Sequence, residues 1–435
     1  MSSNFISELS DLAYSENHII DFLKTYTEFN NSNDSFKQSK SIGVVGFGAM
    51  GKLYTNKLAS NHWSVNICDT MANFEDNTTY INNLDYNKYI NLYESADEVI
   101  MNSDYTMFCT EAHIIAHILD NIKDKSILHN KIIGGQASSK SKEVLSFLQF
   151  KKTYRLDDLS IICLHSMHGP NVPSINQNLA LIPVVVKRNA DLQFVDEFTN
   201  VFESRKHIMT FLQHDQTTAN TQGLTHCVFI NMGRAWYKMG KIFGNNSHVY
   251  SNLAVMNPFS KQYIKVFSEN AQKINERIEN HDGDVLFTEF KEIFAMVFDQ
   301  NINYFSLLGI DETLISCDDD ENTHLSLLAL LKTWHDCKIN PIKDLQLGTP
   351  LYKLLVQTVI KLFSNSNLVK VATKSTKYSE DDKLYVSSVM QYANNIINED
   401  KESFDREFVE VVEFFQGDSM EKVKQKAQKM ILNLK

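Results

Sequence analysis

The sequence has few cysteines and none of the spacings through which cysteine builds a structural framework. It holds six, at positions 68, 109, 163, 227, 317 and 337, and no two of them form a C-x-x-C pair. Isolated cysteines argue against a disulfide scaffold and against a zinc site. We expect each to be a small, reduced, apolar side chain, as in a cytoplasmic protein.

Long hydrophobic runs and an excess of positive charge are also missing. No apolar run approaches the ~18 residues that span a membrane, and the N-terminus lacks the basic and apolar regions of a secretory signal. The net charge is −11, which disfavours nucleic acid as a partner. We therefore expect neither a membrane nor a nucleic-acid partner, and we expect a cytoplasmic location.

Short apolar, β-branched runs occur in the first half of the chain. They predict strands at 41–46, 65–69, 105–109, 131–133, 160–164 and 181–186. Helical patterns at 111–123 and 139–149 separate several of these runs, and such alternation predicts a parallel, doubly wound α/β sheet. Pro183 lacks a backbone N–H, so we expect the last strand either to lie at the sheet edge or to start at Val184.

A glycine loop joins the first expected strand to a helix. It is the G-x-G-x-x-G run formed by Gly46, Phe47, Gly48, Ala49, Met50 and Gly51. In such a loop the first glycine makes a tight turn, the second admits a pyrophosphate, and the third lets the helix pack closely on the sheet. The helix N-terminus then offers N–H groups to the phosphates. The loop therefore predicts a dinucleotide site.

Further cofactor-binding candidates follow the next expected strands. Asp69 ends the second strand, where a carboxylate accepts hydrogen bonds from the adenosine ribose, and on local electrostatics this favours NAD over NADP. Thr110 and Glu111 follow the strand at 105–109. We include both in the predicted cofactor site.

The second half of the chain shows helical periodicity alone. Helices are expected at 215–243, 258–280, 284–308, 324–338 and 350–363. The predicted organisation is an N-terminal extension (1–40), a Rossmann-like domain (41–212), a helical domain (213–365) and a C-terminal helical extension (366–435). The fold class is therefore α/β plus all-α.

Polar residues follow two of the expected strands, at the sheet edge where active sites of this architecture lie. His165 and His168 follow the strand at 160–164, and a histidine there can act as a general base. Ser138 and Lys140 follow the strand at 131–133. That loop can equally be an ordinary strand-to-helix connection, with Ser138 or Ser139 as N-cap.

A third polar stretch opens the helical half. Asp215, next to His214, precedes His226 by about three helical turns, so Asp215 and His226 can share one face. His226 could hold a substrate carboxylate or polarise a carbonyl. A satisfied core histidine is the alternative.

Together these motifs resemble prephenate dehydrogenase, most closely the fungal type, over roughly residues 41–365. The resemblance rests on the glycine loop, the segments 134–140 and 165–170, Thr225-His226, and the later segments 253–258 and 324–329. It implies a Rossmann domain with a helical dimerisation domain in a homodimer. It also implies oxidative decarboxylation of prephenate to 4-hydroxyphenylpyruvate, a step towards tyrosine. The fungal relatives imply NADP, against the local argument from Asp69, and we favour NADP with NAD as the alternative.

The resemblance also assigns roles to single residues. It implies that His165 is the catalytic base for the ring 4-hydroxyl, that Ser138 bonds near that hydroxyl, and that His226 lies near the substrate. Asn252 stands where many bacterial members have an arginine that grips a substrate carboxylate. The candidates to replace it are Lys238, Arg234, Lys241 and Lys261, of which we prefer Lys238. The predicted substrate-binding set is Ser138, Lys140, His168, His226 and Lys238.

Three other functions stay open. An arogenate dehydrogenase would use the aminated substrate. A 3-hydroxyacid dehydrogenase would need a lysine base, for which Lys238 is the nearest candidate. A non-catalytic NADP-binding sensor would bind cofactor without turnover.

Overall fold

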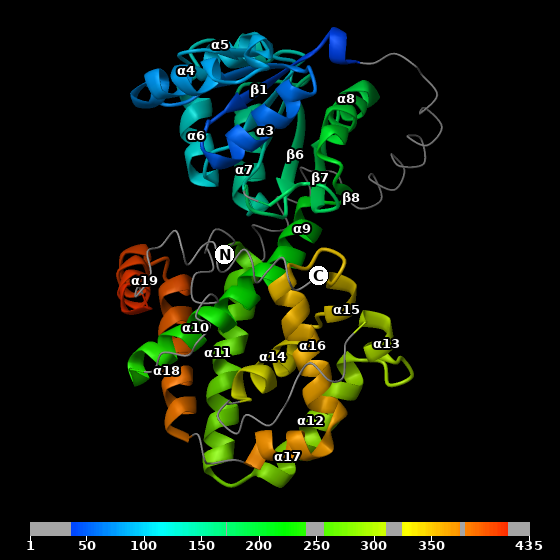
Figure 1. Ribbon diagram of the computed structural model, residues 1–435, viewed down its shortest axis with the longest axis vertical. Coiled ribbons are helices and arrows are strands. Elements are labelled where there is room, and N and C mark those ends of the chain that lie inside the picture. Colours follow the sequence, from blue (N-terminus) through cyan, green and yellow to red (C-terminus); the bar gives the residue numbers. More distant parts are fainter. Residues whose placement is uncertain (1–35, 171, 241–255, 310–323, 375–378, 416–435) are drawn as a thin grey trace. The chain divides into compact units, whose positions relative to one another are not determined.

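The computed structural model describes residues 36–170, 172–240, 256–309, 324–374 and 379–415 (Figure 1). The chain divides into two compact units, Met1–Asp215 and Gln216–Lys435. The division falls inside helix α9 (Phe211–Thr218), a few residues beyond the boundary expected after 212.

The first unit is built on one sheet, whose strands run in the order β3-β2-β1-β4-β5-β6-β7-β8. Every neighbouring pair is parallel except β6 and β7. The two edge strands, β3 and β8, were not predicted. The strands are β1 (Ser41–Val45), β2 (Ser64–Cys68), β3 (Ile90–Leu92), β4 (Tyr105–Phe108), β5 (Ile132–Gly135), β6 (Ser160–Ser166), β7 (Asn178–Val185) and β8 (Arg205–Ile208).

Pro183 corrects the prediction for the last expected strand. It lies inside β7, which is an internal strand between β6 and β8. The register of the β6–β7 ladder shifts between Ile161 and Ile162, and Ile162 is the partner of Pro183. A bulge at this point lets the ladder pass a residue that has no N–H to donate.

Helices cover both faces of the sheet, as the doubly wound prediction requires. Tyr105 and Phe108 of β4 point to opposite faces because side chains alternate along a strand. Tyr105 packs against Phe198, with ring centroids 5.2 Å apart, and Phe108 packs against Phe147 at 5.5 Å. The helices are α3 (Ala49–Ser60), α4 (Phe74–Asn82), α5 (Ala96–Met101), α6 (Ala112–Asn121), α7 (Lys140–Thr153), α8 (Asn189–Thr199) and α9.

Helices are the only regular secondary structure among the described residues of the second unit (Figure 1). Its core is apolar and includes the buried Trp334 of α14. Its helices are α10 (Thr225–Met239), α11 (Pro258–Glu279), α12 (Gly283–Val297), α13 (Tyr304–Leu308), α14 (Leu325–Asp336), α15 (Pro341–Asp344), α16 (Pro350–Ser364), α17 (Ser366–Lys374), α18 (Ser379–Ile397) and α19 (Lys401–Phe415). None of the described helices combines the length and apolar character needed to cross a membrane.

Two sequence expectations for this unit change. The helix expected at 284–308 is broken into α12 and α13, because Asn303 caps the N-terminus of α13 by accepting a hydrogen bond from Ser306 N. The helices after 365 belong to the core of the unit, where Tyr385 and Tyr392 of α18 are buried. They are therefore integral to the helical unit.

The helix expected at 215–243 contains a π-helical segment, Ala219–Leu224, between α9 and α10. Inside it, the Asn220 side chain donates to Asp344 and to the Tyr352 hydroxyl, both at 2.8 Å, and accepts from Trp334 Nε1 at 2.9 Å. These bonds tie the wider turns of the segment to three other helices of the unit. The wider turns also break the regular periodicity on which a shared face for Asp215 and His226 depended.

Candidate functional site

The glycine loop after β1 has the geometry of a dinucleotide cradle. Gly46 has a φ of +96°, and a Cβ there would come within 2.8 Å of the Thr110 side chain. A Cβ on Gly51 would lie 2.1 Å from the carbonyl oxygen of Gly46, so α3 packs tightly against the loop. A Cβ on Gly48, at the N-terminus of α3, would meet none of the described residues within 4 Å, which leaves room for a ligand to approach the backbone.

The other predicted cofactor residues surround this loop. Phe47 is buried and packs edge-on against Tyr80. Ala49 and Met50 form the first turn of α3. The hydroxyl Oγ1 of Thr110 is buried, and it forms no hydrogen bond with any residue that the structure describes. Such an unsatisfied buried donor beside the glycine loop fits a bound dinucleotide.

The acidic members of the predicted set are differently placed. Asp69 directly follows β2, and its carboxylate accepts hydrogen bonds from Thr70 N at 2.8 Å and from the Asn73 side chain at 3.3 Å. Glu111 is exposed and contacts His113. Both Asp69 oxygens therefore already have partners within the chain.

The base candidate His165 lies near the carboxyl end of β6, and its side chain is 5% exposed. Its Nδ1 is 2.8 Å from Nε2 of His214, and Nδ1 of His214 is 2.9 Å from Oδ1 of Asp215. His214 and Asp215, both on α9, are fully buried. The adjacent His214 and Asp215 are visible in the sequence, but no sequence signal indicated a contact with His165.

Burial controls the protonation of both histidines. It lowers the pKa of His165 well below the ordinary 6.5, and the nearby His214, Lys140 and His168 lower it further. Burial also lowers the pKa of His214, although the hydrogen bond to Asp215 opposes this. Both imidazoles are therefore neutral near pH 7.

Asp215 does more than contact His214. Its two carboxylate oxygens accept hydrogen bonds from the backbone N–H groups of Lys140 and Ser141, each at 2.8 Å, and from the Ser141 hydroxyl at 2.6 Å. It therefore caps the N-terminus of α7 from a distant point in the sequence. Ser139 occupies the N-cap position, but its side chain makes no capping bond.

Lys140 does not play the predicted substrate-binding role. Its side chain has no exposed surface, and Nζ donates to Glu143 Oε1 at 2.6 Å and to Gly135 O at 2.9 Å. Glu143 in turn accepts from Ala137 N at 2.9 Å. This buried ion pair holds the loop after β5, and it leaves no room for a Cβ on Gly135, which would lie 2.3 Å from the Glu143 carboxylate.

Several polar atoms of the same sheet edge lack a partner among the described residues. They are buried atoms: Nε2 of Gln136, Oγ of Ser139 and Nε2 of His168. Ser138 is half-buried, and its side chain likewise forms no hydrogen bond within the described residues. Groups of this kind are what a polar ligand would satisfy.

The remaining candidates belong to the helical unit. His226 is half-buried near the start of α10. Lys238 is exposed, and its Nζ lies 3.4 Å from the Ser387 hydroxyl. Arg234 is buried in an ion pair with Glu407, and Lys261 is paired with Glu399. Lys241 and Asn252 lie outside the described residues.

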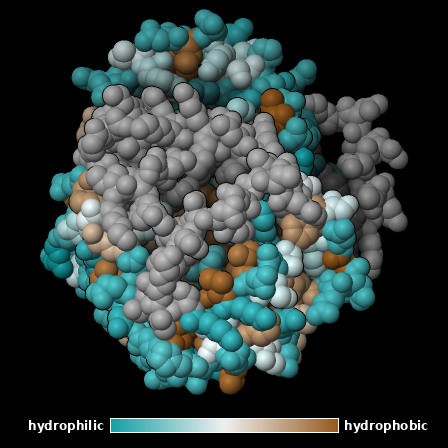
Figure 2. All heavy atoms as spheres, turned by 60° about the horizontal axis from the view of Figure 1, so that its bottom comes forward, coloured by the Kyte–Doolittle hydropathy of each residue, from teal (hydrophilic) through white to brown (hydrophobic). Residues whose placement is uncertain are grey.

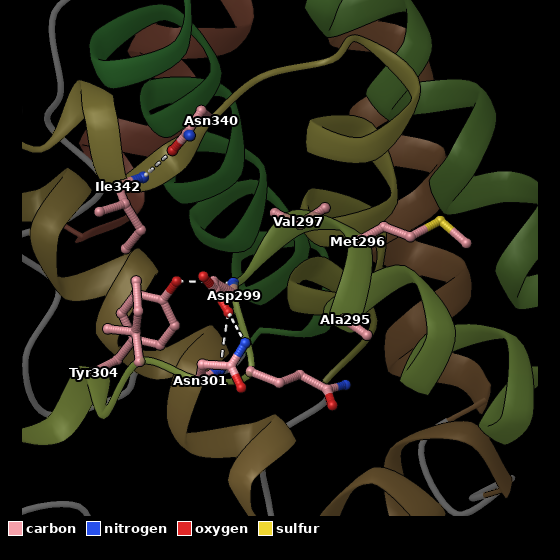
Figure 3. A pocket seen from close by; sticks show the side chains of 10 residues that line it. Ala295, Met296, Val297, Asp299, Asn301, Tyr304, Asn340 and Ile342 are labelled. Atoms are coloured by element: carbon pink, nitrogen blue, oxygen red, sulfur yellow. Dashed lines mark hydrogen bonds between the residues drawn. The ribbon is translucent and has the colours of Figure 1, made fainter.

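A cavity of about 670 Å³ in the helical unit does not have the character of an active site (Figure 3). Its polar groups bond to one another: Asp299 accepts from Asn301, and Asn340 accepts from Ile342 N. Its lining residues are Ala295, Met296, Val297, Asp299, Gln300, Asn301, Ile302, Tyr304, Asn340 and Ile342.

The glycine cradle, the buried histidine at the carboxyl edge of the sheet and the helical second unit define a class. These features are typical of two-unit, Rossmann-type oxidoreductases that use a nicotinamide dinucleotide. Comparison with known proteins shows which members of this class the chain is similar to.

The chain is similar to a probable prephenate dehydrogenase [NADP(+)] of Schizosaccharomyces pombe, with 28% identity over 87% of this chain and 94% of that protein. It is also similar to the prephenate dehydrogenase [NADP(+)] of Saccharomyces cerevisiae, with 26% identity over 88% of this chain and 91% of that protein. The resemblance inferred from the motifs is thereby confirmed.

Two further comparisons concern parts of the chain. Residues 238–435 match the family profile of the Tyr-1-like 6-phosphogluconate dehydrogenase C-terminal domain, so the similarity continues beyond the predicted limit near 365. Among solved structures, an arogenate dehydrogenase of Synechocystis aligns with 14% identity and a TM-score of 0.41, over 56% of this chain and 93% of that one. A likeness this distant does not extend to the substrate.

Proposed function

We propose that the protein is an NADP-dependent prephenate dehydrogenase, which converts prephenate to 4-hydroxyphenylpyruvate and carbon dioxide in tyrosine biosynthesis. The names of the two fungal relatives support the substrate and the cofactor. The observation in the fold that carries the proposal is His165. It is a neutral, buried histidine at the carboxyl end of β6, and its Nε2 forms no hydrogen bond within the described residues.

In the proposed reaction, His165 Nε2 accepts the proton of the ring 4-hydroxyl. The glycine cradle would hold the pyrophosphate of the dinucleotide, whose oxidised nicotinamide would supply the acceptor for the hydride from the same ring carbon. The ring carboxylate then leaves as carbon dioxide, its bonding electrons complete the aromatic ring, and the oxygen regains its proton. A general base of this kind contributes about 10²–10⁴-fold to the rate.

The other site residues receive proposed supporting roles. Ser138 and His168, near the same sheet edge, hydrogen-bond the substrate. His226 is a proposed catalytic residue on the resemblance to prephenate dehydrogenase alone. Lys238 is the proposed carboxylate contact, since its only hydrogen bond in the described residues, to Ser387, is long at 3.4 Å. Lys140 is excluded because Glu143 and Gly135 hold its ammonium group.

We further propose that the enzyme is a cytoplasmic homodimer. Large apolar side chains are exposed on the helical unit, among them Val285, Met296 and Leu307. Figure 2 shows such residues among hydrophilic ones on the face it presents. Light scattering after gel filtration tests the dimer, and cell fractionation tests the location. A monomer at micromolar concentration would contradict the proposed homodimer.

The decisive assay crosses prephenate and arogenate with NAD and NADP. We expect NADPH formation and carbon dioxide release with prephenate, and a higher kcat/KM for NADP than for NAD. Turnover of arogenate alone would identify an arogenate dehydrogenase. Tight NADP binding without turnover of either substrate would identify a sensor.

A further inference from the structure

A chain of three buried side chains runs from α9 to β6. Asp215 contacts His214 at 2.9 Å, and His214 contacts His165 at 2.8 Å. All three residues lie in the α/β unit, and none is more than 5% exposed. This row of side chains ends at Nε2 of His165, which is the proton acceptor in the proposed function.

The direction of each hydrogen bond follows from Asp215. An ionised carboxylate can only accept, so Nδ1 of His214 must carry the hydrogen of that contact. A neutral imidazole has one N–H, so Nε2 of His214 is an acceptor. His165 must then donate from Nδ1, and its Nε2 carries the free lone pair.

Asp215 is held as a carboxylate by the N-terminus of α7. The N–H groups of Lys140 and Ser141 and the Ser141 hydroxyl all donate to it. Donors at a helix N-terminus stabilise a negative charge, and this offsets the cost of burying it. Asp215 is therefore suited to fix the His214 tautomer.

We propose that His214 and Asp215 are positioning residues that hold His165 in the Nδ1–H tautomer, so that the lone pair of its Nε2 can accept the substrate proton. When Nε2 accepts the substrate proton, the positive charge at Nδ1 faces the His214 lone pair, and Asp215 lies beyond it. No second proton needs to move. This inference rests on the proposed function for its catalytic meaning, whereas the tautomer is a property of the protein alone.

The charged and titratable groups around His165 come from several elements. Lys140 of α7 and His168 after β6 both lower its pKa, as does His214. Lys140 is itself paired with Glu143. Substitutions in the experiment leave these other groups in place.

The first test reads the tautomer without substrate. Nitrogen NMR of histidine-labelled protein, with His165→Asn to assign the signal, should show His165 protonated at Nδ1. In His214→Leu, which removes the acceptor, His165 should shift towards the Nε2–H tautomer. In His214→Gln, whose amide can both accept and donate, the Nδ1–H form should persist. An Nε2–H tautomer in the unmodified protein overturns the proposal.

The second test reads turnover. We expect His214→Leu and Asp215→Asn to lower kcat by about 10²–10³-fold with little change in KM, and His214→Gln to recover part of the loss. Ser141→Ala is the matched control, because it removes one donor to Asp215 but leaves the contact with His214. It should lower kcat by less than about threefold.

The outcomes separate the two proposals. If the NMR result holds but prephenate is not turned over, the tautomer assignment stands and the proposed function fails. If Ser141→Ala lowers kcat as much as Asp215→Asn, or if His214→Leu keeps full turnover and the same His165 tautomer, Asp215 is only a helix cap. Circular dichroism melting verifies that each variant is folded.

Discussion

Each unit of the protein buries a polar network, and the two networks end differently. In the α/β unit, Asp215 and His214 lead to His165, whose Nε2 has no partner in the described residues. In the helical unit, the bonds of Asn220 lead to Tyr352, which donates to the carbonyl of Pro341. An open end is available to a substrate, whereas a network that ends on the backbone stabilises a fold.

The two networks also respond to pH in opposite directions. Burial lowers the pKa values of His165 and His214, so a fall in pH destabilises the folded α/β unit. Burial raises the pKa of Asp344, a partner of Asn220, from 3.8 to about 6. Because Asp344 loses its proton as the pH rises, a rise in pH destabilises the folded helical unit.

The largest expected effect is on kcat and comes from replacing His165, the residue at which the network of the α/β unit ends. His165→Asn cannot accept the substrate proton, and we expect kcat to fall by about 10²–10⁴-fold while NADP affinity is kept. Steady-state kinetics and a cofactor titration measure the two quantities. Turnover close to that of the unmodified enzyme would remove His165 from the mechanism and with it the distinction between the networks.

Removing the centre of the closed network should instead affect stability. Asn220→Ala leaves Trp334 Nε1 without its acceptor and Asp344 without a donor. We expect unfolding to become easier by about 3 kcal/mol, measured by urea denaturation. Thr221→Val, which removes one hydrogen bond to Thr217 O in the same segment, should cost about 1 kcal/mol. An equal loss of unfolding free energy in the two variants would show that Asn220 stabilises the unit no more than a single hydrogen bond does.

Asp344→Asn should stabilise the protein. The raised pKa means that the folded state binds the proton more tightly between pH 3.8 and about 6, so stability falls as pH rises through this window. The asparagine keeps an acceptor for Asn220 and carries no charge. We expect a gain of roughly 2 kcal/mol at pH 7 and little gain at pH 4. A variant that is less stable than the parent at pH 7 contradicts this assignment.

The smallest expected effect is the change in folding stability with pH that the two buried histidines cause. The unfolded state takes up protons below pH 6.5, whereas buried His165 and His214 resist them, so stability falls as pH drops below 6.5. Each group contributes up to about 1.4 kcal/mol per pH unit. His214→Gln should make the slope between pH 6.5 and 5 shallower.

The matched control for that slope is His281→Asn. His281 is exposed, and its φ of +61° suits asparagine. This substitution should leave the slope unchanged in thermal melts across the same pH range. A change as large as that of His214→Gln would show that burial is not the cause.

Sequence patterns predicted most of the sheet because apolar, β-branched runs mark buried strands. They missed β3 and β8, which are short edge strands with fewer buried positions. They also predicted that the strand with Pro183 lies at an edge or starts at Val184, because they carry no information on the bulge opposite Pro183. Patterns report on single strands, whereas strand order and register depend on neighbours.

The candidate site was predicted in the same uneven way. His165 lies near the end of a strand and the glycine loop directly follows one, so their place at the sheet edge could be inferred from the sequence. The contact between His165 and His214 could not, because it joins two segments with no shared periodicity. Lys140 looked like a free cation, since its partner Glu143 can be recognised only once both side chains are known to be buried.

The sequence alone determined the fold class, the cofactor loop and the residue types at the carboxyl edge of the sheet, because these depend on local periodicity and on glycines at set spacings. The tertiary structure decided what each polar residue does. It made Lys140 a buried structural cation, Asp215 both a helix cap and a partner of His214, and His165 a buried imidazole whose Nε2 has no hydrogen-bond partner among the described residues. The physical reason is desolvation: burial determines which charges persist and which hydrogen bonds must form, and burial is a property of the whole fold.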